Sequence, residues 1–294
     1  MTLAPVSHRT VEVDGVDVFY REAGPPDAPV LLLPHGYPSS SFQYRTLMPA
    51  LGDRWRLVAP DFPGFGYTSL PPRDAFDYSF PGYARLLARF TEALGIDRYA
   101  LYLFDYGSWT GFQLALRHPE RIAALVIQNG DAYEGALGPG YAALQAYWAN
   151  PTPEGREALA AGLTEEGLRD EVLGRVPWPV RDRISPDLWR LSRPRVEDPF
   201  VRELMLDLFG HLAEMVERMP DHQAYLRKHR PPTLILWGPN DGYMPERSAR
   251  AYLADLPDAE LHVFPDGGHW LLETHLDEVV ARLRDFLGRV HAGA

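Results

Sequence analysis

The first part of the chain alternates short apolar runs with stretches of helical spacing. Residues 30–33, 57–59 and 99–104 are continuous apolar runs, which are typical of strands buried on both faces of a parallel sheet. Residues 82–94 carry apolar side chains at helical spacing and end at Gly95, a common helix stop. Strands that alternate with helices predict right-handed β-α-β units, so we expect an α/β fold with a mostly parallel central sheet and helices on both faces. The further elements expected are strands over 11–20, 123–128, 233–237 and 260–264 and helices over 110–117 and 276–287.

A long segment in the middle of the chain interrupts this pattern. Residues 132–225 are rich in proline, charge and aromatic side chains, with helical spacing at 141–148 and 153–163 and no convincing buried strand. We therefore predict one core domain formed by residues 1–131 and 226–294, with residues 132–225 inserted as a helical lid.

Composition narrows the class of protein. Of the 294 residues, 46% are apolar and 23% are charged, as in soluble globular domains. The absence of cysteine excludes disulfides and thiolate metal sites, and the net charge of −11 argues against nucleic acid or anionic lipid as a partner. Lys228 is the only lysine, and no metal or nucleotide motif is present. No apolar stretch approaches the roughly 18 residues of a membrane span, so we expect a cytoplasmic protein. We further expect a monomer or homodimer that uses no cofactor or metal.

Three polar residues follow predicted strands, at the sheet edge where sites form in α/β proteins. Asp105 sits at the turn between a strand and a helix, Asp241 follows the strand at 233–237, and His269 follows the strand at 260–264. Taken alone, Asp105 could simply cap the helix and His269 could be structural. The chain order nucleophile, acid, histidine favours a catalytic set, because it is the order described for α/β-hydrolases.

Two further loops resemble those of epoxide hydrolases and haloalkane dehalogenases. Residues 33–38 read Leu-Pro-His-Gly-Tyr-Pro, and residues 61–66 read Asp-Phe-Pro-Gly-Phe-Gly. The chain is thus similar over essentially its whole length to the α/β-hydrolase superfamily, in which the insertion would be a lid over the site. Aspartate rather than serine at position 105 resembles the branch that forms an alkyl-enzyme ester.

This resemblance, together with carboxylate chemistry, implies a two-step reaction on an epoxide or a haloalkane. Asp105 would attack carbon to give a covalent ester, and His269 would activate the water that hydrolyses it. Asp241 would hold the imidazole in the correct tautomer. The backbone N–H groups of Tyr37 and Tyr106 are the expected donors to the oxyanion.

Three alternatives remain open. Asp131, in the Gln-Asn-Gly-Asp sequence 128–131, could replace Asp241 as the acid, whereas Asn129 cannot carry the charge. An esterase or lactonase would use Ser108, although Ser108 lies beyond the apex of the turn. A non-catalytic protein with this fold would bind a small ligand, but it would have no need of a complete Asp-Asp-His set.

The residues around the leaving group decide between the two named activities. Dehalogenases of this kind usually carry tryptophan where this chain has Tyr106, and many carry asparagine at the place of Tyr37. Epoxide hydrolases use two lid tyrosines, whose places fall near residues 144–145 and 211–212, where this chain has none. An indole pair around Asp105 would favour halide release, and a phenol pair would favour epoxide opening. The candidates for a pocket that takes a small apolar substrate and water are His35, Trp109, Gln145 and Trp148, with Tyr133, Tyr141, Tyr147 and Tyr225 as possible proton donors.

Overall fold

A computed structural model describes residues 3–292 and contains one eight-stranded sheet in the order β1-β2-β4-β3-β5-β6-β7-β8. The first two strands pair antiparallel with their neighbours, and the remaining pairs are parallel. The mostly parallel sheet is therefore confirmed. The strands are β1 (Val6–Val13), β2 (Val16–Ala23), β3 (Val30–Leu32), β4 (Arg56–Pro60), β5 (Tyr99–Phe104), β6 (Ile122–Gln128), β7 (Thr233–Trp237) and β8 (Glu260–Val263).

The start of the chain differs from the sequence-based prediction. Residues 11–20 were expected to form one strand, but they contain the turn of the β1-β2 hairpin. Asp14 and Gly15 take φ values of 50° and 83° at this turn. Asp-Gly is a strong signal for a two-residue hairpin turn with positive φ at both positions, so the alternation at 11–20 belongs to two strands.

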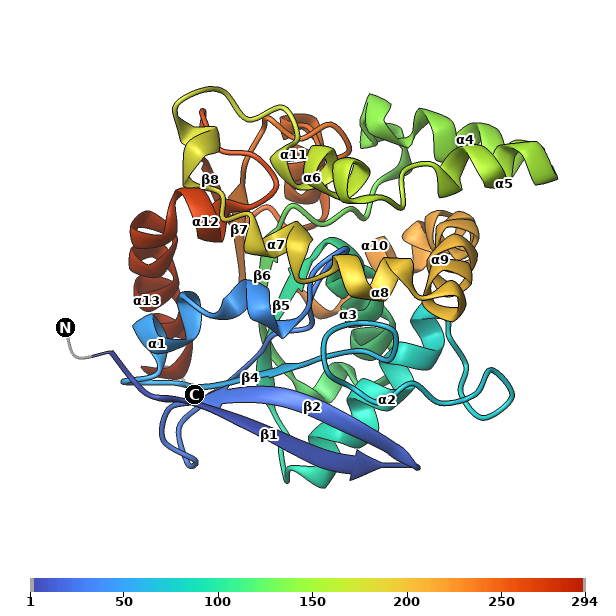
Figure 1. Cartoon of the computed structure of the whole chain (residues 1–294). Helices are drawn as coiled ribbons and strands as arrows, with labels where there is room; N and C mark the ends of the chain where they lie inside the picture. The colour runs from blue at the N-terminus through green and yellow to red at the C-terminus, as the bar shows by residue number, and fades with distance from the viewer. Residues whose placement is uncertain (1–2, 293–294) are drawn as a thin grey trace.

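Helices cover both faces of the sheet, as expected from the alternation of strands and helices. Helices α2, α3 and α10 pack together on one face and α11 joins them, whereas α1 and α13 pack together on the other (Figure 1). Strands β3, β5, β6 and β7 are accordingly buried along their whole length. These helices are α1 (Leu47–Leu51), α2 (Phe80–Ala93), α3 (Asp105–Arg117), α10 (Met219–His229), α11 (Glu246–Asp255) and α13 (Leu276–Ala292), and the short helix α12 (Leu271–Thr274) contacts α13.

The segment between β6 and β7 is helical and forms no strand within the described residues. Figure 1 shows helices α4 to α9 gathered on one side of the molecule, in the upper part of the view. The division into core and lid stays a prediction; its boundary at residue 225 falls inside α10, which packs against α3. The helices of this segment are α4 (Ala142–Ala149), α5 (Pro153–Ala160), α6 (Glu165–Leu173), α7 (Asp187–Arg190), α8 (Arg193–Glu197) and α9 (Pro199–Glu217).

Across residues 3–292, no helix combines the length and hydrophobicity that crossing a bilayer would require.

Candidate active site

Asp105 stands at a sharp turn where β5 passes directly into α3. Its φ of 47° lies in the left-handed region, which is unfavourable for a residue other than glycine. The turn is held by close backbone approaches: a Cβ on Gly107 would lie 2.2 Å from the carbonyl oxygen of Pro34, and one on Gly36 would lie 2.7 Å from the Cβ of Asp105. Glycine at these two positions allows the turn to press against the loop that follows β3.

The carboxylate of Asp105 receives backbone N–H groups from the loop that follows β3 and from the first turn of α3. The N–H of Tyr37 donates to Oδ1 at 2.6 Å. Burial raises the pKa of Asp105, and His269 together with backbone hydrogen bonds from Tyr106 and Tyr37 acts in the opposite direction. These donors stabilise the anion, so the two predicted oxyanion groups already converge on Asp105.

His269 lies between the two carboxylates. Its Nδ1 is 2.6 Å from Oδ2 of Asp241, and its Nε2 is 3.6 Å from Oδ2 of Asp105. Burial alone would lower the pKa of His269, but Asp241, followed by Asp105 and Glu171, raises it to about 9. The imidazole is therefore largely protonated at neutral pH while Asp105 is free.

Asp241 is fixed as an anion by its surroundings. Its Oδ1 accepts the backbone N–H groups of Tyr243 at 2.8 Å and Met244 at 3.1 Å. Burial would raise the pKa of Asp241, but His269, the Tyr243 N–H and the Asn129 amide hold it below its ordinary value. The side chain has the hydrogen bonds that a buried charge requires.

Asn129 carries no charge and cannot be the acid, but the structure shows that it positions Asp241. Its Nδ2 donates to Oδ2 of Asp241 and to the carbonyl of Gly238, both at 2.9 Å, and its Oδ1 accepts the Gly238 N–H at 3.0 Å. Asn129 has a φ of 40°, and asparagine tolerates this conformation better than most residues.

Asp131, the alternative acid, faces a different partner. Its Oδ2 accepts the hydroxyl of Tyr141 at 3.1 Å, whereas the 2.6 Å contact to His269 belongs to Asp241. Burial, reinforced by the charge of Asp241, raises the pKa of Asp131 to about 8. A carboxyl that is mostly protonated at neutral pH is poorly suited to stabilise an imidazolium.

Ser108 does not face the site. It is fully buried, and its Oγ donates to the backbone carbonyl of Asp105 at 2.6 Å. A Cβ placed on Gly130 would lie 2.8 Å from the Cβ of Ser108, so that side of the helix is closely packed.

A cavity of about 230 Å³ opens beside Asp105. Four tyrosines, one glutamate and apolar side chains from α4, α5 and α9 line it, so these helices lie over the carboxyl end of β5. The hydroxyl of Tyr106 is buried without a hydrogen-bond partner among residues 3–292. The side chains that line the cavity include Tyr37, Tyr106, Tyr141, Tyr243, Glu171, Leu144, Leu159, Phe209 and Leu212.

The four pocket candidates from the sequence lie outside this cavity, and their assignment is corrected here. His35 shapes the neighbouring loop, because its Nε2 accepts the backbone N–H of Phe62 at 3.1 Å. Trp109 is buried on α3 with its ring near His222. Gln145 is on the exposed side of α4, where spacing by eye could not distinguish it from Leu144. Trp148 donates its indole N–H to the carbonyl of Phe209 at 2.7 Å.

Among the possible tyrosine donors, the structure brings Tyr141 to the cavity and places the others elsewhere. Tyr133 donates its hydroxyl to Asp255 at 2.8 Å, and Tyr225 stacks on His229. Glu171 and Tyr243, which also line the cavity, were not predicted from the sequence. Position 243 could have been found, since it lies two residues after Asp241 in the same loop.

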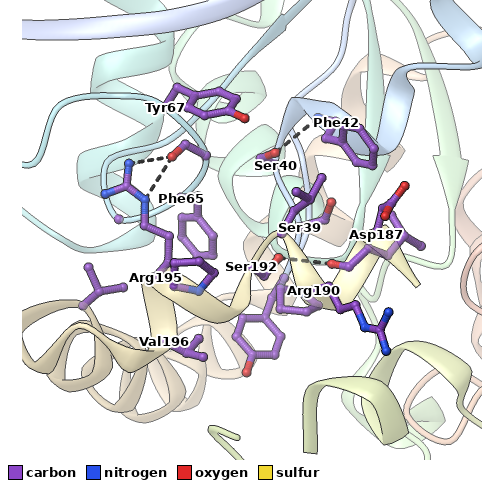
Figure 2. A pocket seen from close by; sticks show the side chains of 18 of the residues that line it. Ser39, Ser40, Phe42, Phe65, Tyr67, Asp187, Arg190, Ser192, Arg195 and Val196 are labelled. Atoms are coloured by element: carbon purple, nitrogen blue, oxygen red, sulfur yellow. Dashed lines mark hydrogen bonds between the residues drawn. The ribbon is translucent and has the colours of Figure 1, made fainter. Parts of the chain in front are cut away.

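A second cavity of about 310 Å³ lies between the loops that follow β3 and β4 and the short helices α7 and α8. Figure 2 shows Arg195 reaching across it beside Phe65 and Tyr67, where its guanidinium donates to the carbonyl of Gly66. Tyr37 lines this cavity as well as the one beside Asp105. Its side chain is therefore a wall shared by the two spaces.

No group of three or more His, Asp or Glu side chains within residues 3–292 is arranged to hold a metal ion.

Comparisons with known proteins support the resemblance to α/β-hydrolases at the level of the family. The model of the alpha/beta hydrolase fold family matches residues 29–276. The uncharacterized hydrolase YNR064C of Saccharomyces cerevisiae is 34% identical over 277 residues, which cover 92% of each chain. Two relatives have named activities. They are a cis-3-alkyl-4-alkyloxetan-2-one decarboxylase of Shewanella oneidensis, 28% identical over 97% of this chain and 90% of the relative, and a haloalkane dehalogenase of Bradyrhizobium diazoefficiens, 27% identical over 97% and 95%.

Solved structures show the same fold. A loop variant of the haloalkane dehalogenase DbeA from Bradyrhizobium elkanii superposes with a TM-score of 0.81, at 22% identity and over 98% of each chain.

Proposed function

The chain belongs to the alpha/beta hydrolase fold family and is a hydrolase, and we propose that it opens small apolar epoxides through a covalent ester on Asp105. The observation that carries this proposal is the surroundings of Asp105. Its carboxylate is held by backbone N–H groups, faces His269 and opens onto a cavity with phenols in its lining. Neither Trp109 nor Trp148, the two indoles considered from the sequence, lines that cavity.

In the first step, Asp105 attacks a carbon of the epoxide and the C–O bond breaks. Oδ1 is held by the Tyr37 N–H, so Oδ2 is the oxygen available as nucleophile. The oxygen that leaves carbon needs hydrogen-bond donors; Tyr106 lines the cavity, and its buried hydroxyl, which has no partner among residues 3–292, is the candidate. No atom of the epoxide departs in this step.

In the second step, water attacks the carbonyl carbon of the ester. The N–H of Tyr37 already donates where the carbonyl oxygen would lie, and such a donor contributes ~3 kcal/mol when charge develops there. Esterification removes the charge of Asp105, one of the groups that raise the pKa of His269. Loss of this charge lowers the pKa of His269, which favours the neutral imidazole that the second step requires.

The oxygen atom of the epoxide and the oxygen atom of water can be followed separately to test this order of events. A single turnover in water labelled with ¹⁸O should place the label in the Asp105 carboxylate, because water attacks the enzyme's own acyl carbon. Label found only in the product would exclude the covalent ester.

A trapped intermediate distinguishes the substrate classes. His269→Gln should accumulate the ester, and an epoxide should increase the intact mass by its full mass. A bromoalkane would add its mass less hydrogen bromide, and its faster reaction would favour a dehalogenase. The haloalkane dehalogenase and the oxetan-2-one decarboxylase among the relatives make a bromoalkane and a cis-3,4-dialkyloxetan-2-one the appropriate comparison substrates.

A serine hydrolase is the alternative within enzymes. Labelling of Ser108 by a fluorophosphonate would support it, but the bond from Ser108 to the Asp105 carbonyl argues against it. Tight binding of an apolar ligand without any covalent adduct would instead indicate a binding protein.

A further inference from the structure

Glu171, on α6, lines the same cavity as Asp105, and the two-step reaction above gives it no role. It is half-buried, and its Oε2 accepts the hydroxyl of Tyr243 at 3.1 Å. Arg169 on the same helix pairs with Glu166 and Asp170 instead. Glu171 therefore holds a phenol as its partner in a mostly apolar space.

Two carboxyl groups that share such a space cannot both be charged without a large cost in free energy. Asp105 has the stronger support for its anion, namely the Tyr37 N–H and the imidazolium of His269. Glu171 has only the Tyr243 hydroxyl as a hydrogen-bond donor among residues 3–292. The proton shared by this pair of carboxyl groups should accordingly reside on Glu171.

The ionisable groups around Glu171 agree with that assignment. Burial raises the pKa of Glu171 to about 7; the charge of His269 and the Tyr243 hydrogen bond oppose the rise, and the charges of Asp105 and Asp241 reinforce it. Burial raises the pKa of Tyr37 and of Tyr106, which line the same cavity, and the charge of Glu171 adds to the rise. A substantial fraction of Glu171 is thus neutral at pH 7.

Most of the tyrosine hydroxyl groups around the cavity are poorly placed to give a proton to the substrate. The hydroxyl of Tyr243 is already donated to Glu171, and that of Tyr141 is donated to Asp131. The Tyr106 hydroxyl can donate a hydrogen bond, but burial raises its pKa well above the ordinary value, so full proton transfer from it is costly.

Building on the proposed function, we propose that Glu171 is a further catalytic residue, the acid that protonates the oxygen of the epoxide. As Oδ2 of Asp105 forms a bond to carbon, the C–O bond breaks and its electron pair takes the proton of the Glu171 carboxyl. The products are a neutral hydroxy-ester and the Glu171 carboxylate. His269, protonated in the free enzyme, releases its proton to solvent once the ester has formed, and the neutral imidazole then takes a proton from the attacking water. Cleavage of the ester leaves the Asp105 carboxylate, the diol and the imidazolium of His269. The Glu171 carboxylate takes up one proton from solvent, so the cycle closes with one epoxide and one water consumed.

The test measures ester formation separately from hydrolysis. His269→Gln serves as the parent, because it traps the ester and removes the titration of the imidazole. The growth of the adduct with saturating styrene oxide is followed by rapid quench and intact mass between pH 6 and pH 9. In the parent, the rate should decrease at alkaline pH, with a midpoint at or above pH 7 because the positive charge of His269 no longer lowers the pKa of Glu171.

Adding Glu171→Gln should lower the rate at pH 6.5 by about 100-fold, the typical contribution of a general acid, and should abolish the alkaline decrease. Glu171→Asp should restore part of the rate together with the decrease, which also guards against a misfolded glutamine variant. Glu166→Gln is the matched control, because Glu166 is an exposed glutamate on the same helix and should change neither quantity.

A rate that is lower but keeps its alkaline decrease in Glu171→Gln would overturn the proposal in favour of a structural role. An unchanged rate would assign the proton to the phenols. If the parent itself formed no adduct with any epoxide, the proposed function would fail first, and this inference would fall with it.

Discussion

Replacing Asp241 by asparagine tests which acid orients His269. Oδ2 of Asp241 lies 2.6 Å from Nδ1, whereas Asp131 bonds to Tyr141. The amide of asparagine can donate to Nδ1, so the imidazole would keep its proton on Nε2, the nitrogen that faces Asp105 and must accept a proton from water. We therefore expect Asp241→Asn to form the ester but to hydrolyse it slowly.

The size of the effect follows from the electrostatics of His269. A pKa raised from 6.5 to about 9 corresponds to ~3 kcal/mol of preference for the imidazolium, and Asp241 is the largest of the groups that produce it. Loss of this stabilisation together with the wrong tautomer should slow hydrolysis of the ester by about 10³- to 10⁴-fold. Formation of the ester, which needs no base, should change by less than about tenfold on the same reasoning.

The assay mixes the enzyme with excess epoxide, removes the excess and follows the disappearance of the adduct by intact mass. Asp131→Asn is the matched control, because it makes the same chemical change at the competing carboxyl. The reasoning would be refuted if the ester cleared at the wild-type rate in Asp241→Asn, and the acid would be reassigned if Asp131→Asn alone preserved the adduct.

Four other changes have definite expected outcomes. Tyr106→Phe removes a buried hydroxyl that has no partner among residues 3–292, so it should slow ester formation by about 10-fold or more and raise the midpoint of urea unfolding; an unchanged rate would exclude this hydroxyl from the reaction. Gly36→Ala places a Cβ 2.8 Å from Oδ1 of Asp105, and we expect it to abolish adduct formation while circular dichroism stays native. Ser108→Ala should cost ~1 kcal/mol of unfolding free energy and leave single-turnover rates within about threefold, whereas a serine hydrolase would lose its activity. Asp131→Asn should stabilise the protein more at pH 8 than at pH 5. The pKa of about 8 means that the folded state retains a proton that the unfolded state loses above its ordinary pKa near 4, so wild-type stability declines over this range; equal gains at both pH values would contradict the assignment.

The central elements of the fold could be predicted because their signals are local. The runs at β5, β6 and β7 are fully buried strands, and a continuous apolar run is what such burial requires. The residues at the ends of these strands follow from the same logic, which is why Asp105, Asp241 and His269 could be named before the structure placed them within contact of one another.

The cavity could not be predicted to the same extent, because its walls come from side chains far apart in the sequence. Gln145 and Leu144 are neighbours on α4, yet the rotation of that helix exposes the first and turns the second to the cavity. Glu171 gave no signal, since a glutamate on an amphipathic helix is ordinarily solvated. Asn129 was judged by its charge, and its contribution depends on a left-handed backbone that brings both ends of its amide to Gly238 and Asp241.

The backbone N–H and the side chain of Tyr37 contact different parts of the site. Its backbone N–H contacts Asp105, and this N–H would be present with any residue other than proline. Its side chain divides one space of about 230 Å³ from another of about 310 Å³. Mutation at this position is therefore expected to alter the length of molecule that is accommodated without removing the donor that the proposed reaction uses. Position 37 is a place where the selectivity of the enzyme can diversify during evolution, or be redesigned, at little cost to the reaction itself.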